Sequence, residues 1–215
     1  MYSSLNSNGS TVWAKDAEKG EKYFCPCCNE PTILKSGKIK APHFAHKSHH
    51  NCDPWYSEMS DWHREWQERF PLNCREVVIR HNGERHRADI CIGKYIIEFQ
   101  NSYLSDEQFI KRTEFYTSAG YKLIWVFNVK NKNIIPHRRR NVYNWKNPVN
   151  TFKRFDTSNK DVFLYFDMND TDRPLHRIDW LCRDGNRFSP KYFAVFCKGP
   201  FRINNFVNYI KAGFM

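Results

Sequence analysis

The sequence predicts a mixed α/β (α+β) fold, with a small cysteine-rich unit before the core and a β-rich extension after it. Three observations support this prediction. Aromatic residues recur at helical spacing in residues 58–70, and three short strand-like runs separated by two tight-turn signals fill residues 74–100. An amphipathic stretch at 105–118 and an apolar run at 121–127 follow. The expected order of the core is therefore helix, three-stranded meander, helix and strand.

The first helix is expected over residues 58–70. Trp62, Trp66 and Phe70 recur every four residues and share one face of a helix. Pro71 follows directly and ends the helix, because proline lacks the backbone N–H that a further turn needs. The aromatic stripe is expected to pack against the core.

A two-residue turn at 93–94 joins the second and third strands of the meander. Gly at its first position suits a type II′ hairpin, which places Asp89 opposite Glu98 and Arg87 opposite Gln100. Opposed side chains share a face, with Cβ atoms about 4.5–5.5 Å apart. Two carboxylates there repel each other unless a cation lies between them, and Mg²⁺, at about 2.0–2.1 Å from each oxygen, would fit. The alternative is that both acids are solvated or paired with Lys or Arg.

The neighbours of Glu98 favour the metal site. Ile96, Ile97 and Phe99 are too apolar for a solvated strand, so Glu98 is expected to be buried. A buried carboxylate without a partner is costly, which favours a ligand or catalytic role. The pattern therefore indicates a hydrolytic metal site.

A second turn signal, at 82–83, joins the first two strands. Asn-Gly is the sequence of a type I′ hairpin, and its register places Glu76 opposite Asp89. Three acids would then form one row across the three strands. The alternative for Glu76, which we favour, is a pair with Arg87 or Lys94.

The second half of the core combines a helix with a buried strand. Residues 105–118 are expected to form the helix, with Gly120 as its C-terminal cap and 121–127 as the buried strand. Beyond it, residues 131–160 are rich in Asn, Pro and Arg and are expected to be a connection. Further strands are expected at 161–166, 175–182 and 191–197, and a terminal helix at 201–210.

The charge balance favours a polyanionic partner. The 215-residue chain has 34 Lys and Arg against 23 Asp and Glu, a net charge of +11. Arg138, Arg139 and Arg140 lie in a basic segment that also carries Trp145 and other aromatics, a combination that suits phosphate contacts and base stacking. DNA is the expected partner. The alternative is a solvated basic loop.

Localisation and redox state are also expectations. No apolar run is long enough to span a membrane, and the polar N-terminus lacks the apolar core of a signal peptide. We therefore expect a cytoplasmic protein without a membrane partner. Its eight cysteines are then better explained as metal ligands or core residues than as disulfides.

A compact unit is expected at residues 23–52, after a loose lead-in at 1–20 in which Trp13 already belongs to a short strand. Ser36-Gly37 marks a turn between two short strands, and the unit is too small to fold without a cross-link or a bound metal ion. The sequence indicates that a structural zinc ion stabilises this unit.

Five side chains are candidates for the four positions of a tetrahedral zinc site. Cys25 and Cys28 form a thiolate knuckle, and His43, His46 and Cys52 follow. The preferred set is Cys25, Cys28, His46 and Cys52, with His43 as the substitute for either of the last two. Four protein ligands would leave no open position, so the expected role is structural.

The motifs together resemble one known family. The order of the elements, with Asp89 and Glu98 on the meander, resembles the PD-(D/E)XK nuclease superfamily with its restriction-endonuclease-like αβββαβ core. More narrowly, the chain resembles the competence protein CoiA family of nucleases, with a zinc-finger-like N-terminal unit. The matching segments within residues 23–128 are Cys25-Pro26-x-Cys28, Pro42–His46, Trp62-His63-x-x-Trp66-Gln67, Arg87–Ile90, Ile97–Ser102, and Arg112 with Phe115-Tyr116.

The resemblance implies a Mg²⁺- or Mn²⁺-dependent deoxyribonuclease. It implies that Asp89 and Glu98 hold the metal, that His63 belongs to the active site and that Arg112 faces the site to bind phosphate. Gln100 stands where the superfamily usually has Lys, which leaves open the group that activates water. From its position on the strand, Gln100 could orient a water molecule or a phosphate.

The expected organisation is a zinc unit at 1–55, a nuclease core at 56–130 and a basic, β-rich extension at 131–215. The expected function is hydrolysis of DNA phosphodiester bonds in DNA processing, recombination or defence, by a monomer, a homodimer or a chain with a protein partner. The alternatives are a zinc-containing nucleic-acid-binding module with an inactive nuclease core, and an RNase.

Overall fold

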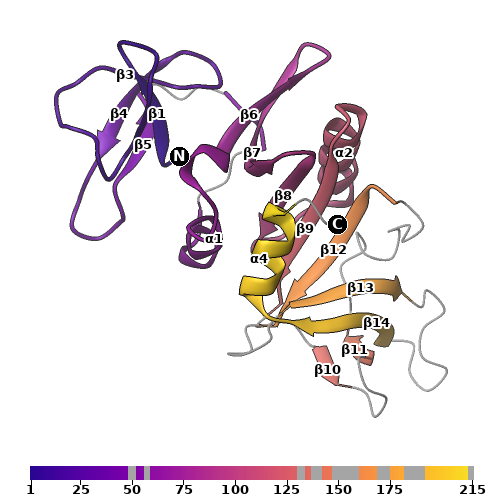
Figure 1. Cartoon of the computed structure of the whole chain (residues 1–215). Helices are drawn as coiled ribbons and strands as arrows, with labels where there is room; N and C mark the ends of the chain where they lie inside the picture. Colours follow the sequence, from indigo (N-terminus) through magenta and orange to yellow (C-terminus); the bar gives the residue numbers. More distant parts are fainter. Residues whose placement is uncertain are drawn as a thin grey trace.

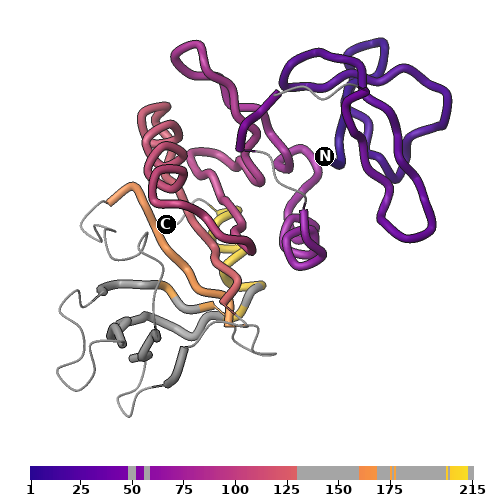
Figure 2. Tube along the Cα trace, turned by 180° about the vertical axis from the view of Figure 1, so that it is seen from behind, coloured from indigo at the N-terminus to yellow at the C-terminus, as the bar shows by residue number. Residues whose placement is uncertain are grey.

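The computed structural model describes residues 1–47, 52–55, 59–129, 134–136, 142–146, 160–168, 175–181 and 192–212. The fold is mixed α/β, with two sheets and few helices (Figure 1). The small N-terminal sheet lies at the β6 end of the large sheet, away from β10 and β11 (Figures 1 and 2). No described helix is long and apolar enough to cross a membrane.

The N-terminal sheet has five strands in the order β2-β1-β3-β4-β5. Their bounds are β1 Ser3–Asn6, β2 Thr11–Trp13, β3 Tyr23–Phe24, β4 Pro31–Lys35 and β5 His43–His46. The short strand expected at Trp13 is confirmed as β2, but the prediction of a loose lead-in was otherwise wrong, because β1 lies inside this sheet and Ser3 and Ser4 are buried. Local sequence could not reveal this, since β1 pairs with β3, which lies far along the chain.

The large sheet has nine strands in the order β10-β11-β14-β13-β12-β9-β8-β7-β6. Their bounds are β6 Arg75–His81, β7 Glu84–Ile92, β8 Tyr95–Gln100, β9 Lys122–Asn128, β10 Ile134–Pro136, β11 Val142–Lys146, β12 Val162–Asp167, β13 Leu175–Leu181 and β14 Tyr192–Phe201. The helices are α1 Asp61–Gln67, α2 Asp106–Ser118 and α4 Ile203–Lys211, and a short 3-10 turn covers Leu72–Cys74. The predicted core order of helix, meander, helix and strand is confirmed.

Both predicted hairpin turns are confirmed. Asn82 and Gly83 have φ of 47° and 78°, the two positive values that a type I′ turn requires, and Gly93 has φ of 56° at the first central position of its turn. The β7–β8 register follows the prediction from Ile92↔Tyr95 to Ile90↔Ile97.

The register is interrupted beside the acidic residues. The pairing of β6 with β7 skips Glu76 and Asp89, and Glu76 has φ of 51°. The β7–β8 ladder ends at Ile90, so Arg87 does not lie opposite Gln100. The predicted pairs of Glu76 with Asp89 and of Asp89 with Glu98 are therefore absent from the ladders, although the neighbouring pairs keep the predicted register and all three acids line one pocket. A residue forced into the left-handed region no longer follows the alternation of an undisturbed strand.

The strands after residue 130 extend the same sheet. β12 pairs with β9 in parallel over six residue pairs, and β13 and β14 continue beyond it. The connection expected at 131–160 contains two short strands, β10 and β11, which the Asn- and Pro-rich composition did not predict.

The large sheet has a core on each face. On one face, α2 packs Phe109, Phe115 and Tyr116 against strand residues such as Trp125. On the other face, Trp66 of α1 and Phe206 and Ile210 of α4 pack against residues such as Phe99. The predicted aromatic stripe of the first helix therefore faces this core.

Helix α1 is shorter than predicted and is fixed by its indoles. It begins after Ser60, whose hydroxyl accepts from the His63 N–H at 3.3 Å. The indole Nε1–H groups of Trp62 and Trp66 each donate to Oδ2 of the buried Asp167 on β12, at 2.8 Å. These bonds fix the helix on the sheet and thereby place His63 beside the meander.

Candidate active site and metal centre

A narrow pocket of about 50 Å³ lies where the meander meets α1 and α2. All four predicted catalytic residues line it, as does Arg112; the lining residues are Asp53, Trp55, Met59, His63, Glu76, Arg87, Asp89, Glu98, Phe99, Gln100 and Arg112. The pocket therefore gathers side chains that lie up to 59 positions apart in the chain. Their catalytic roles remain predictions.

Asp89 lies where β7 parts from β8. Its Oδ2 accepts from the Phe99 backbone N–H at 2.8 Å. The side-chain carboxylate thus replaces the backbone carbonyl of β7 as the acceptor for β8. Its Oδ1 lies 2.9 Å from Nε2 of His63, and Gln67 Nε2 lies 3.4 Å from the same oxygen. The Asp89 carboxylate is thus held in one orientation from both sides.

Glu98 is buried, as predicted, with 4 % of its surface exposed. The Tyr116 hydroxyl donates to its Oε1 at 2.9 Å, and Nη1 of Arg112 lies 3.5 Å from its Oε2. Burial, and secondly the charge of Asp89, raise the pKa of Glu98 to about 8, although Arg112 and Tyr116 act in the opposite direction. Without a cation, the two carboxylates therefore resist being charged together.

Arg112 closes the pocket from α2. Its Nη2 donates to the Trp55 carbonyl at 2.6 Å, and its guanidinium lies 5.5 Å from the centre of the Trp55 ring. Its buried Nε has no hydrogen-bond partner among the described residues. Arg112 faces the site as the family resemblance implied, and it neutralises part of the charge on Glu98.

Gln100 is 8 % exposed and lines the pocket at the end of β8. Its Nε2 donates to the backbone carbonyl of Ser102 at 3.0 Å and to the Ser102 hydroxyl at 3.1 Å. These bonds fix the amide and the start of the following loop.

The carboxylates fit a divalent cation with oxygen ligands. Mg²⁺ commonly takes one or two protein carboxylates and completes its octahedron with water and substrate phosphates. Asp89 and Glu98, which line the same pocket, could provide those two carboxylates. Among the described residues, the only convergence of three or more Cys, His, Asp or Glu ligand atoms is elsewhere, in the N-terminal unit.

That second group is a Cys₃His cluster that fits a structural zinc site. The ligand atoms of Cys25, Cys28, His46 and Cys52 all lie within 4.8 Å of one another. The Cys25 and Cys52 sulfurs are 3.5 Å apart, and the Cys28 sulfur lies 3.3 Å from His46 Nε2. A zinc tetrahedron with Zn–S of about 2.3 Å and Zn–N of about 2.0–2.1 Å gives similar separations.

The cluster is the preferred set of the sequence analysis. His43, the fifth candidate, is not part of it: its Nδ1 lies 2.9 Å from the Ala41 carbonyl oxygen. Burial raises the pKa of the Cys25 thiol, but the backbone N–H of Cys28 and the charge of Arg87 bring that pKa below its usual range. A lowered pKa favours the thiolate that zinc requires.

A buried ion pair joins this unit to the core. Nη1 of Arg87 lies 3.5 Å from Oε2 of Glu76, and Nη2 of Arg87 lies 3.5 Å from the Cys25 sulfur. The backbone N–H groups of Tyr2 and Ser3 donate to Glu76 at 2.8–3.1 Å. Burial opposes ionisation, yet Arg87 and these donors hold the pKa of Glu76 below its usual range. Glu76 is thus a partner of Arg87, the alternative that the sequence favoured.

Comparison with known proteins identifies the family. The competence protein CoiA N-terminal domain matches residues 8–54, and the competence protein CoiA nuclease-like domain matches residues 75–183. The chain belongs to the competence protein CoiA family. The resemblance stated from the motifs is therefore confirmed, and the nuclease-like domain of this family contains both Asp89 and Glu98.

One curated relative is competence protein CoiA of Bacillus subtilis (strain 168). It is 28% identical over 118 residues, which are 50% of this chain and 32% of that protein. This CoiA-family chain therefore matches about a third of the length of that relative. No solved structure matches the chain.

Several site residues of this CoiA-family chain had no predicted role. Gln67 follows His63 by one helical turn and contacts Asp89, and Tyr116 follows Arg112 by one turn and contacts Glu98. The i, i+4 spacing is the signal that could have identified both. Trp55 carries no comparable signal, because its carbonyl reaches the site from an irregular segment.

Other expected contacts lie elsewhere. Arg138, Arg139 and Arg140 lie outside the described residues, so their predicted binding of nucleic acid stays a prediction. Lys94, the other partner considered for Glu76, is exposed in the β7–β8 turn and does not line the pocket.

Proposed function

We propose that this chain is a divalent-metal-dependent deoxyribonuclease that hydrolyses DNA phosphodiester bonds. The observation that carries the proposal is a pair of carboxylates, the partly buried Asp89 and the buried Glu98, which line one pocket inside the nuclease-like domain. Keeping two acids in one pocket costs stability unless a cation is bound there. A net charge of +11 supports a polyanionic substrate.

The residues of the pocket have distinct tasks in this proposal. Asp89 and Glu98 would hold Mg²⁺ or Mn²⁺, which when bound polarises the scissile phosphate and lowers the pKa of a bound water. The Phe99 N–H and His63 orient the Asp89 carboxylate. Arg112, near Glu98, is placed to offset charge that develops on the phosphate.

His63 is our candidate for the group that accepts a proton from water. It lies in the pocket with Nε2 2.9 Å from Asp89 Oδ1, so Nδ1 would be the nitrogen that accepts the proton. Gln100 carries no titratable group, so its proposed task is to orient water or phosphate.

The biological setting that we propose is processing or recombination of DNA, as in competence, with defence as the alternative. The support is the family itself and the relative called competence protein CoiA. The structural zinc ion would stabilise the N-terminal unit and take no part in hydrolysis, since four protein ligands fill its coordination sphere.

The test is cleavage of single- and double-stranded DNA, and of RNA of the same sequence, with Mg²⁺ or Mn²⁺. Glu98→Gln and Asp89→Asn should lose cleavage by at least about 100-fold but keep salt-sensitive binding. Glu114→Gln, which removes an exposed carboxylate on α2, is the matched control and should cleave normally.

The other outcomes separate the alternatives. Cleavage of RNA alone would make the chain an RNase. Binding without cleavage under either metal would favour a zinc-containing binding module, and equal cleavage by Glu98→Gln would place the active site elsewhere.

A further inference from the structure

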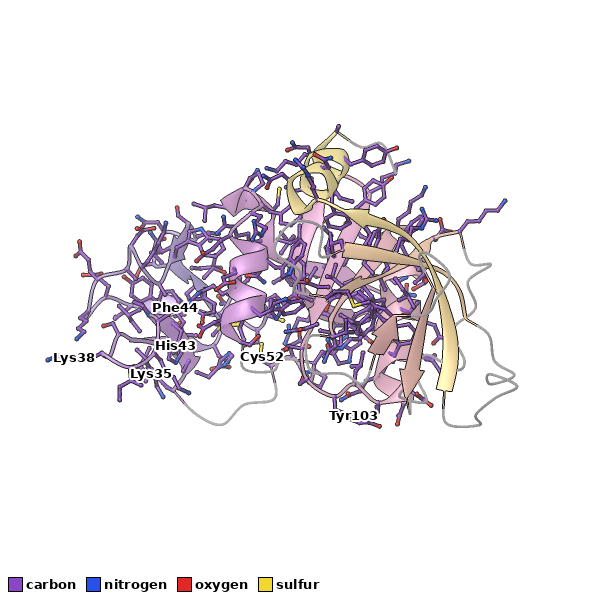
Figure 3. All side chains as sticks on the ribbon, turned by 90° about the horizontal axis from the view of Figure 1, so that it is seen from below. Lys35, Lys38, His43, Phe44, Cys52 and Tyr103 are labelled. Atoms are coloured by element: carbon purple, nitrogen blue, oxygen red, sulfur yellow. The ribbon has the colours of Figure 1, made fainter. Side chains whose placement is uncertain are left out.

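Tyr103 is an exposed aromatic residue beside the candidate active site. It lies in the loop between β8 and α2, three positions after Gln100, and 74 % of its surface is exposed. Figure 3 shows Tyr103 at the rim of the molecule. The side chain makes no hydrogen bond or ring contact with the residues that the structure describes. Its exposure is therefore not explained by packing.

The loop that carries Tyr103 is fixed at several points. Gln100 donates to Ser102 on one side, and Asn128 Nδ2 donates to Asn101 Oδ1 at 2.8 Å. On the other side, Leu104 is buried with 6 % exposure. Ser105 then caps α2 by accepting from the Gln108 N–H at 3.2 Å. The loop thus holds the backbone of Tyr103 in place while its ring faces solvent.

The backbone of Tyr103 lies close to the pocket. Three residues of fully extended chain span at most about 11 Å, so the Cα atom of Tyr103 lies within that distance of the Cα atom of Gln100, which lines the pocket. A nucleic-acid strand advances about 3.4 Å per nucleotide in a duplex and can be more extended when single, so this span corresponds to at most about three nucleotides. A group bound at Tyr103 would belong to the nucleotides next to the scissile phosphate.

The surroundings of the ring favour a base over a phosphate. Asp106 and Glu107 occupy the first turn of α2 directly after the loop, and their charge disfavours a phosphate there. An aromatic face is neutral and stacks on any base, contributing about 1–3 kcal/mol per base.

We propose that Tyr103 stacks on a base of single-stranded DNA, within about three nucleotides of the bond to be cut. This inference rests on the proposed nuclease function and assigns its substrate as a single strand, or as a frayed or branched end. In an intact duplex the faces of the bases are covered by their neighbours. A strand with free base faces can use Tyr103, whereas a closed duplex cannot.

The experiment measures binding separately from cleavage. Fluorescence anisotropy is recorded for a short labelled single strand with the full zinc-loaded chain carrying Glu98→Gln, so that the strand stays intact. Adding Tyr103→Ala should weaken binding about 5- to 150-fold, which corresponds to about 1–3 kcal/mol. Tyr103→Phe keeps the stacking face and should bind within about twofold of the parent. Tyr209→Ala, which removes an exposed tyrosine on α4, should have no effect.

A set of abasic strands identifies the base. One nucleotide at a time is replaced by an abasic residue, which keeps the phosphates and removes the stacking face. At one position, removing the base should weaken binding to the parent protein as much as Tyr103→Ala weakens binding of the intact strand. With the strand that lacks this base, Tyr103→Ala should cause no further loss of affinity. An intact duplex should bind equally well with and without Tyr103→Ala.

Two results would overturn the inference. One is an unchanged affinity of Tyr103→Ala for the intact single strand. The other is an equal loss on every abasic strand and on the duplex, which would indicate a general change in the surface. If the chain cleaves no DNA but Tyr103 still contributes through one base, the nuclease proposal fails and the stacking site stands. If the chain cleaves DNA without any contribution from Tyr103, the nuclease proposal stands and the stacking site is ruled out.

Discussion

Glu98→Gln should stabilise the protein in the absence of Mg²⁺ at neutral and alkaline pH, although it should abolish cleavage. The reason is that the pKa of Glu98 is about 8 in the folded protein, raised by burial and by Asp89. In the unfolded chain a Glu side chain has a pKa of about 4.3. Between these two pH values the folded state binds more protons than the unfolded state. The free energy of unfolding therefore falls as pH rises through this window.

The magnitude follows from the difference between the two pKa values. A gap of about 3.7 units at about 1.36 kcal/mol per unit gives an upper bound of about 5 kcal/mol at pH 8 and above. At pH 7 the bound is about 4 kcal/mol, and near pH 4 it is close to zero. Glutamine cannot ionise, but its amide fits the donors of Tyr116 and Arg112 less well, at a cost of about 1–2 kcal/mol. The expected net gain is about 1–3 kcal/mol at pH 8, with a small loss near pH 4.5.

The assay is urea unfolding followed by tryptophan fluorescence, on zinc-loaded protein in buffers without Mg²⁺ at pH 4.5 and pH 8. Glu114→Gln is the matched control and should stay within about 0.5 kcal/mol of the parent at both pH values. Mg²⁺ should then raise the stability of the parent at pH 8 and leave that of Glu98→Gln unchanged. A variant that is less stable than the parent at both pH values would refute the reasoning, because the carboxylate would then be well accommodated without a cation.

Three further perturbations test the structure. Arg87→Met should destabilise the protein by about 3–5 kcal/mol in the same unfolding assay, because it leaves the buried Glu76 carboxylate without its cation. The control is Arg85→Met, at an exposed position, which should change the stability by less than about 0.5 kcal/mol. The chain should bind one zinc ion, measured by elemental analysis, and a zinc chelator should expose residues 1–47 to proteolysis before the core. Asp167→Ala should lower the stability by about 2–4 kcal/mol in thermal unfolding, because two indole N–H groups lose their acceptor, and Asp167→Asn should cost less.

Much of the core follows from local sequence. Asn82-Gly83 and Gly93 fix the two hairpin turns and hence the register of most of the meander. The zinc ligands were predictable as a set because the cysteine and histidine spacings match a tetrahedral site and because the unit is too small to fold alone. His63 and Asp89 were expected in one site, and the structure places them 2.9 Å apart.

The rest depends on partners that are distant in the sequence. The Glu76 carboxylate accepts hydrogen bonds from the backbone N–H groups of Tyr2 and Ser3, which lie more than 70 positions away. No local sequence pattern predicts such a bond. The insertion of β12 between β9 and β13 depends likewise on pairing across a long connection. The strands that the sequence did not predict are accordingly β1, near the N-terminus, and β10 and β11, within residues 131–160.

The interruption of the meander and the location of the candidate site have a common physical cause. In an undisturbed ladder, the backbone N–H of Phe99 would donate to a backbone carbonyl of β7. The side chain of Glu76 would then lie beside that of Asp89 on one face of the sheet. Because Glu76 takes a left-handed conformation and turns to Arg87, Asp89 is released from the ladder and its carboxylate accepts from Phe99 instead. Irregularities of this kind are common beside active sites, where they redirect a side chain. We therefore regard the failure of strict alternation at Asp89 as the feature that builds the pocket, and the zinc unit as the support that keeps Arg87 and Glu76 in place.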